Sequence, residues 1–146
     1  MSLLAVMVAV VTAALAAIHL YWGFGGIWPG TDQKSCARAV AGFKGVDRMP
    51  PLAASFAVAL ALFAVALLPL ALAGLIVLPL PAWLTRIAGV AAALVFVGRG
   101  VAGFTPAWRR LTPEMPFARN DRLYYSPLCL AIGAGLLLLA LQGSAA

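Results

Sequence analysis

The sequence predicts an all-α integral membrane protein whose four transmembrane helices form an antiparallel bundle. Hydrophobic residues make up 64% of the 146-residue chain and charged residues only 10%. The hydrophobic residues come in long blocks rather than alternating stripes, and an apolar run of about 18 or more residues is a candidate transmembrane helix. Because a chain this short forms one domain, we expect a single membrane domain over residues 1–146.

Prolines and basic residues bound the expected spans, which cover about residues 3–24, 52–77, 82–104 and 123–142. Pro50 and Pro51 precede the second span, where a proline is tolerated because the first N–H groups of a helix have no helical partner. Pro79 and Pro81 leave a very short turn, which predicts that the second and third spans form a hairpin. The first block lacks the basic start of a signal peptide, so we expect it to be retained, with cleavage as the alternative.

The basic residues predict the orientation. Eight of the ten Lys and Arg residues lie in segments 25–50 and 105–122, which four spans place on one face. Basic residues beside spans mark the cytoplasmic side and contact anionic lipid head groups. We therefore expect a multi-pass protein of the bacterial inner (cytoplasmic) membrane, with both termini outside the cytoplasm. This placement explains the net charge of +6, because the basic residues contact membrane lipid. We therefore expect membrane lipid as a partner and no nucleic acid.

Arg99 constrains the function most, because it is a permanent cation inside an apolar stretch. A guanidinium at mid-helix depth costs about 2.5 to 3.5 kcal/mol on insertion scales. The apolar blocks contain no carboxylate, so a loop carboxylate, neutral side chains or a bound anion must satisfy it. Asp121, just before the fourth span, is the preferred partner; the alternatives are Asp47, Glu114, Asp32 or a ligand.

Other polar side chains gather at the same end of the expected bundle. We expect Arg99, His19 and Tyr125 to line one cytoplasm-facing pocket between the spans, with Ser126 and Trp22 completing the ligand-binding set. Glycines beside Arg99 leave space for a neighbouring helix or a guest group. The alternatives are that Trp22 anchors the membrane interface and that His19 is an ordinary contact within the bundle.

The usual catalytic and metal-binding patterns are absent from the sequence. The spans hold no pair of carboxylates, and the chain has neither a phosphate-binding loop nor a nucleophile elbow. One histidine and two separated cysteines, Cys36 and Cys129, do not supply a conventional metal-ligand set. We therefore expect no metal, no cofactor and two free thiols, and we identify no catalytic residue.

A resemblance to a known family rests on three parts of the chain: residues 19–26 (His-Leu-Tyr-Trp followed by a Gly-Gly pair), Arg99, and the block from Phe117 to Cys129. The last block is the most specific, with Phe-Ala, an Asp and then Tyr-Ser-Pro-Leu-Cys. These residues resemble an uncharacterised bacterial group, domain of unknown function 3995, which implies a small four-helix membrane protein. Members tend to carry an acidic residue shortly after the arginine, where this chain has Gly103 and Phe104.

Two residues of the C-terminal block have structural explanations. We expect Asp121 to cap the fourth helix and favour its positive end, and Pro127 to lie in the first turn or two of that helix.

The leading functional hypothesis is a non-enzymatic protein that binds a lipid-like, apolar or anionic amphiphilic ligand, or that supports a larger membrane complex. An enzyme acting on an apolar substrate is the alternative, with His19 as acid/base and Arg99 as electrostatic stabiliser. A transporter of this length would have to oligomerise.

Overall fold

The computed structural model describes residues 1–142, and over this range all regular structure is helical. Four helical segments are long and apolar enough to cross a membrane: α1 (Ser2–Gly23), α3 (Leu52–Leu72), α4 (Ala82–Ala102), and a continuous run of α6 (Phe117–Asn120), the π-helical η1 (Asp121–Tyr125) and α7 (Ser126–Gln142). Two short helices, α2 (Gln33–Val40) and α5 (Pro106–Leu111), lie in the two basic segments.

The expected spans match these helices closely, with two differences. The first is that α3 ends at Leu72 and not near residue 77. Gly74 adopts a φ of +70°, and the N–H of Leu75 donates to the carbonyl of Leu70, which terminates the helix. The second is that the last helical run begins at Phe117, well before residue 123.

The π-helical turn η1 ends two residues before Pro127, which is in the first turn of α7. A proline inside a helix has no N–H to donate, and its ring crowds the carbonyl four residues earlier. A π turn is wider, with bonds between residues five apart, and here the N–H of Ser126 donates to the carbonyl of Asp121. This wider turn explains how a proline fits within one continuous helical run.

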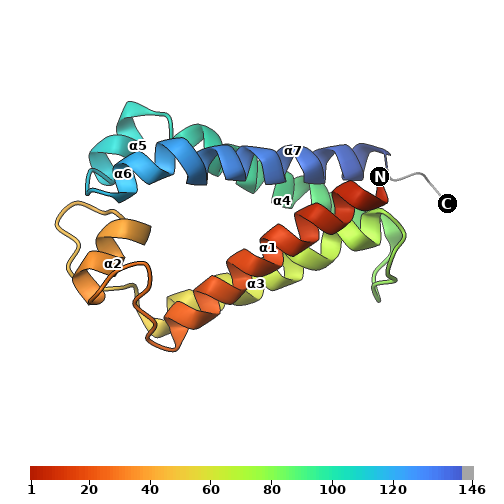
Figure 1. Cartoon of the computed structure of the whole chain (residues 1–146). Coiled ribbons are helices and arrows are strands. Elements are labelled where there is room, and N and C mark those ends of the chain that lie inside the picture. The colour runs from red at the N-terminus through yellow and green to blue at the C-terminus, as the bar shows by residue number, and fades with distance from the viewer. Residues whose placement is uncertain (143–146) are drawn as a thin grey trace.

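The long helices pack as two pairs, α1 with α3 and α4 with α7 (Figure 1). Glycines allow the backbones of the second pair to approach closely. A Cβ at Gly133 would lie 3.0 Å from the carbonyl oxygen of Ala93, and one at Gly100 would lie 2.9 Å from that of Ser126. Gly98 has no such neighbour within 4 Å, so of the two glycines beside Arg99 only Gly100 serves packing.

The two pairs meet toward the end of the molecule that carries the α3–α4 turn, residues 73–81, here called the hairpin end (Figure 1). A buried apolar cluster there draws on all four long helices: Val8, Leu68, Ala93, Ile132 and Leu136. A Cβ at Gly135 of α7 would lie only 2.7 Å from the Val8 side chain of α1, so the two pairs are in close contact.

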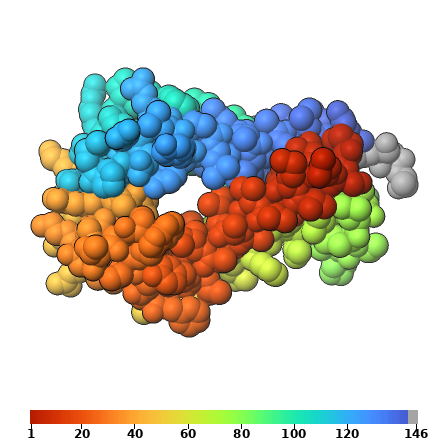
Figure 2. Space-filling model, in the orientation of Figure 1, coloured from red at the N-terminus to blue at the C-terminus, as the bar shows by residue number. Residues whose placement is uncertain are grey.

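Toward the opposite end, here called the loop end (residues 24–51 and 103–125), the two pairs diverge (Figure 1). The space-filling view shows an opening between α1 and α7 (Figure 2). Beyond this opening the two loop segments are joined by backbone hydrogen bonds, from Lys44 to Leu111 at 3.1 Å and from Glu114 to Gly42 at 3.2 Å. The opening is therefore bounded by the apolar cluster at one end and by the joined loops at the other.

Candidate functional site

Arg99 is neutralised within the protein by Asp121. Arg99 lies in the last turn of α4, and its Nη2 donates to Oδ1 of Asp121 at 2.5 Å. The Asp121 side chain is fully buried, whereas 29% of the Arg99 side chain is exposed. Short, charge-assisted hydrogen bonds of this kind are about twice as strong as neutral ones. The partner preferred on sequence grounds is confirmed.

The short helix α5 supplies two more donors to this carboxylate. The Thr105 hydroxyl caps α5 by accepting from the backbone N–H of Trp108, and a proline occupies the first helical turn. The Nε1 of Trp108 donates to Oδ2 at 2.9 Å, and the Nη2 of Arg109 donates to the same oxygen at 3.2 Å. The Arg99 guanidinium also lies 4.6 Å from the centroid of the Trp108 ring, which adds a cation–π contact.

Ser126 contributes the fourth donor. Its hydroxyl donates to Oδ1 of Asp121 at 3.2 Å and accepts from Nη1 of Arg99 at 3.3 Å. The π turn places these two residues, five apart in sequence, on one face. Gly103 provides the room, because a Cβ there would lie 1.7 Å from the Ser126 hydroxyl oxygen. We call Arg99, Trp108, Arg109, Asp121 and Ser126 the Arg99 cluster.

The chemistry of the Arg99 cluster suits a structural joint better than an acid or base. The carboxylate of Asp121 accepts four hydrogen bonds, two on each oxygen, which occupies about all of the acceptor sites of a carboxylate. Two guanidinium groups and one carboxylate leave a net charge of +1. Arg99 thus has a counter-ion within the protein, which it shares with Arg109.

The expected helix-capping role of Asp121 is wrong. The helical run starts upstream at Phe117, so the N–H groups after Asp121 already have helical partners, and Asn120 precedes η1 without a side-chain cap. The carboxylate is directed to the guanidinium groups instead.

A second group of contacts, here called the loop junction, joins the two loop segments. Glu114 Oε1 accepts from the backbone N–H of Gly45 at 2.9 Å. Its Oε2 lies 3.3 Å from Nε of Arg38, in an ion pair whose geometry does not make a hydrogen bond. The hydroxyl of Tyr125 donates to the carbonyl of Ala39 at 3.3 Å, so it ties the end of η1 to the C-terminal end of α2.

His19 makes its contacts within α1. Its Nδ1 lies 2.7 Å from the carbonyl oxygen of Leu15, and because a carbonyl only accepts, Nδ1 carries the proton and Nε2 the lone pair of the neutral ring. The ring meets that of Trp22 edge-on, with centroids 5.0 Å apart. Among residues 1–142, the hydrogen bonds of His19, Arg99 and Tyr125 thus go to separate partners. A carboxylate is a stronger acceptor for Arg99 than a neutral imidazole or a tyrosine hydroxyl. That the three residues line one pocket stays a prediction.

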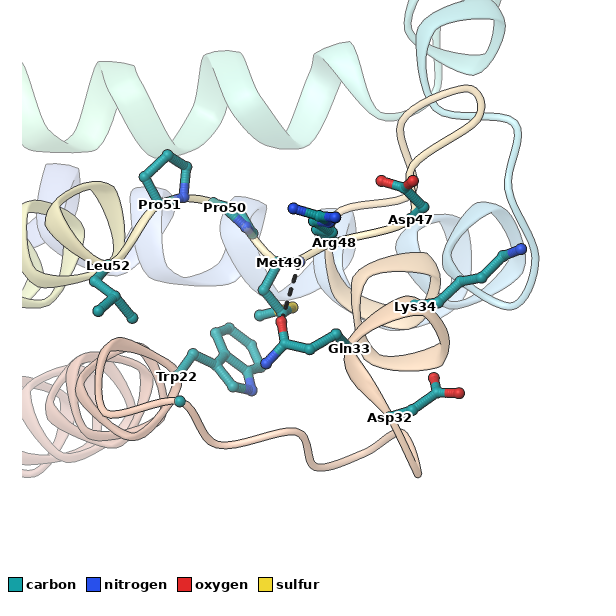
Figure 3. A pocket seen from close by; sticks show the side chains of 11 residues that line it. Trp22, Asp32, Gln33, Lys34, Asp47, Arg48, Met49, Pro50, Pro51 and Leu52 are labelled. Carbon is teal, nitrogen blue, oxygen red and sulfur yellow. Dashed lines mark hydrogen bonds between the residues drawn. The ribbon is translucent and has the colours of Figure 1, made fainter.

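Trp22, the remaining predicted ligand residue, lines a cavity of about 570 Å³ at the loop end, here called the Trp22 cavity. Its indole N–H donates to the carbonyl of Trp28 at 2.8 Å, which fixes the ring. Trp22 and Leu52 lie at the ends of the long helices, and charged side chains of the loop segment lie on the other side (Figure 3). The full lining is Trp22, Gly25, Asp32, Gln33, Lys34, Asp47, Arg48, Met49, Pro50, Pro51 and Leu52.

Two titratable groups near this cavity have shifted pKa values. The Asp32 carboxylate caps α2 by accepting from the backbone N–H of Ser35 at 2.7 Å, and this bond lowers the pKa of Asp32. Burial raises the pKa of the Cys36 thiol, which has no exposed surface. No group of three or more His, Cys, Asp or Glu side chains within residues 1–142 is arranged to hold a metal ion.

Sequence reasoning missed Trp108 and Arg109 as members of the cluster. It attributed the basic residues of that segment to the membrane surface. The Thr105-Pro106 pair is typical of a helix start and could have predicted the short helix α5, but not the direction in which it leaves α4.

Comparison with known proteins identifies the family. The model of Protein of unknown function (DUF3995) matches residues 12–136, and the chain belongs to this family. No curated protein and no solved structure matches the chain. The description of this family names no activity.

Proposed function

We propose that the chain is an antiparallel four-helix membrane protein of a bacterial inner membrane, with the loop end in the cytoplasm and both termini outside. Four helices of sufficient length and hydropathy support this proposal. The charge distribution also supports it, because eight of the ten basic residues lie in the loop-end segments. Large apolar side chains on the long helices, such as Leu60 and Val95, are each 71% exposed, and in a membrane lipid would cover them.

Within the membrane, we propose that the protein is non-enzymatic and holds a lipid-like molecule whose apolar tail occupies the opening between α1 and α7. The observation that carries this proposal is the divergence of the two helix pairs, which leaves the opening visible in Figure 2. Both helices beside it are strongly apolar in sequence. An empty gap would forfeit dispersion contacts along its walls, and an acyl chain restores them.

The Arg99 cluster and the loop junction have a supporting role in this proposal. The cluster fixes the loop end of α4 to the start of α7, which forms one wall of the opening. Tyr125 then links that wall to α2. A rigid frame of this kind lowers the ordering cost of binding.

Photocross-linking tests the proposal. The full-length protein is reconstituted with a phospholipid that carries a diazirine on one acyl chain, and the cross-linked peptides are mapped. We expect adducts to concentrate on α1 and α7 where these helices face each other. Tyr125→Phe removes the hydrogen bond to α2 and should change the yield, whereas Tyr124→Phe, at an exposed neighbouring position, should not. Adducts spread evenly over the outward faces of all four long helices would contradict the proposal, as would a second polypeptide occupying the opening.

The enzyme alternative has one specific observation in its favour. With Nδ1 bonded to Leu15, the neutral His19 ring keeps Nε2 as a lone-pair site able to accept a proton. His19→Gln separates the two functions. If the protein is an enzyme, the variant should retain its amphiphile but lose turnover. If it only binds, mass spectrometry should recover the same unaltered molecule from wild type and variant.

A further inference from the structure

At and beside the loop end some charged side chains form ion pairs, and others within residues 1–142, among them Lys44, Arg110, Arg119 and Arg122, do not. Arg99, Arg109, Asp121, Arg38 and Glu114 are engaged in ion pairs. In contrast, three charged side chains make no hydrogen bond or ion pair within residues 1–142 and line the same Trp22 cavity: Lys34, Asp47 and Arg48. Side chains of both signs of charge therefore line one cavity without a hydrogen bond or ion pair to another side chain among these residues.

The Trp22 cavity has an apolar side and a charged side. In Figure 3, Trp22 and Leu52 lie at the ends of α1 and α3, and Asp47, Lys34 and Asp32 lie on the loop side. Asp32 uses one carboxylate oxygen, Oδ1, to cap α2. With Arg48 included, two carboxylates and two cations line the cavity, so its side chains carry no net charge.

The depth of the cavity indicates the kind of molecule it meets. Trp22 is the last residue but one of α1, and Leu52 is the first residue of α3. Given the membrane placement proposed above, the cavity lies where two spans leave the bilayer, at the level of lipid head groups. Tryptophan is enriched at this level because its ring is amphipathic.

We propose that the Trp22 cavity binds the head group of a zwitterionic phospholipid that carries a primary ammonium, of the phosphoethanolamine type. Arg48 and Lys34 contact the phosphate, for which the guanidinium fork is well suited. Asp47 and Asp32 accept hydrogen bonds from the ammonium, which has three donors. The start of the acyl chains lies against Trp22 and Leu52.

The lining also predicts which head groups bind less well. A quaternary ammonium has no N–H to donate and is recognised by aromatic cages, but Trp22 is the only aromatic residue of this lining. A purely anionic head group leaves the two carboxylates without a partner. The inference rests on the proposed membrane placement but not on a lipid tail occupying the opening between α1 and α7.

Native mass spectrometry of the full-length protein tests this assignment, with phosphatidylethanolamine, phosphatidylcholine and phosphatidylglycerol of identical acyl chains in competition. We expect preferential retention of phosphatidylethanolamine. Because ion pairs near the surface are screened, Arg48→Gln and Asp47→Asn should each weaken this preference by about two- to fivefold. Arg110→Gln is the matched control, since Arg110 is an exposed arginine of α5 outside the cavity lining.

Each outcome decides the assignment. Equal retention of the three lipids, or an equal effect of Arg110→Gln, would refute the head-group site while leaving cross-links in the α1–α7 opening unaffected. Displacement of the lipid by soluble glycerophosphoethanolamine at a similar concentration would assign the cavity to a free zwitterion and overturn the lipid assignment. Conversely, a retained head-group preference without cross-links in the opening would refute the proposed function alone. Circular dichroism checks that each variant is folded.

Discussion

Replacing Asp121 with asparagine is the most direct test of the Arg99 cluster. The change keeps the size of the side chain and removes its charge. The buried carboxylate accepts from four donors, and an amide can accept only through its single oxygen while its NH₂ group faces other donors. Breaking a buried ion pair by removing one member costs about 3 to 5 kcal/mol, so we expect a loss of this size in the free energy of unfolding.

Arg99→Met should cost less than Asp121→Asn. After this change Asp121 keeps the hydrogen bonds from Trp108, Arg109 and Ser126. The Arg99 side chain is 29% exposed, so solvent already screens part of the interaction. The loss of one hydrogen bond to a charged group corresponds to about 1.5 to 3 kcal/mol. In the double variant, Asp121→Asn no longer leaves the Arg99 guanidinium unpaired. The loss in the free energy of unfolding should therefore be smaller than the sum of the losses of the two single variants, by about 1 to 3 kcal/mol.

Unfolding in mixed detergent micelles with increasing SDS, followed by circular dichroism, measures these free energies. Asp47→Asn is the matched control, because Asp47 is an exposed carboxylate without a hydrogen bond within residues 1–142, and its loss should change stability by less than about 0.5 kcal/mol. The reasoning is refuted if Asp121→Asn costs no more than this control. Strict additivity of the two cluster variants would also refute it.

The same unfolding assay separates two glycines of the α4 end: Gly103→Ala should lose about 1 to 3 kcal/mol through overpacking, whereas Gly98→Ala, with open space around it, should gain up to about 1 kcal/mol of helix propensity. Equal effects would contradict the packing. The raised pKa of Cys36 gives it a smaller thiolate fraction at a given pH than a free cysteine has, and its side chain has no exposed surface. Maleimide should therefore label Cys36 slowly at pH about 8, and faster once SDS unfolds the protein. Cysteines introduced near residues 40 and 112 of a cysteine-free variant should react only with membrane-permeant reagents, and labelling of either from outside would reverse the orientation.

The long apolar blocks and the prolines and basic residues that bound them predicted the four long helices, because a bilayer imposes a length and a polarity on any helix that crosses it. Asp121 was the preferred partner of Arg99 because the apolar blocks contain no carboxylate and Asp121 lies just before the expected fourth span, although Asp47, Glu114, Asp32 and a ligand stayed open. Both inferences rest on strong energetic constraints, namely the cost of exposing backbone or charge to hydrocarbon. Such constraints leave few alternatives, so a single sequence is sufficient.

The arrangement around that pair was not predictable in the same way. Whether Trp108 and Arg109 reach the carboxylate depends on the direction in which α5 leaves α4, and hydrophobic periodicity has no information about that direction. The loop junction depends on Glu114 meeting the backbone of Gly45, far away in sequence. Energies of about 1 kcal/mol decide contacts of this kind, and many alternative loop paths offer similar energies.

The contacts made by the four acidic residues of the chain favour the Trp22 cavity as a ligand site. Asp121 is buried against two guanidinium groups, Glu114 joins the two loop segments, and Asp32 caps α2. Each of these carboxylates has a partner that accounts for it. Asp47 alone makes no hydrogen bond or ion pair within residues 1–142, and it lines a cavity beside two cations that also have none. The chain has a net charge of +6, so cations outnumber carboxylates. Asp47 nevertheless lines the Trp22 cavity with Lys34 and Arg48 and forms an ion pair with neither. This arrangement fits a site that binds a zwitterion from outside the chain.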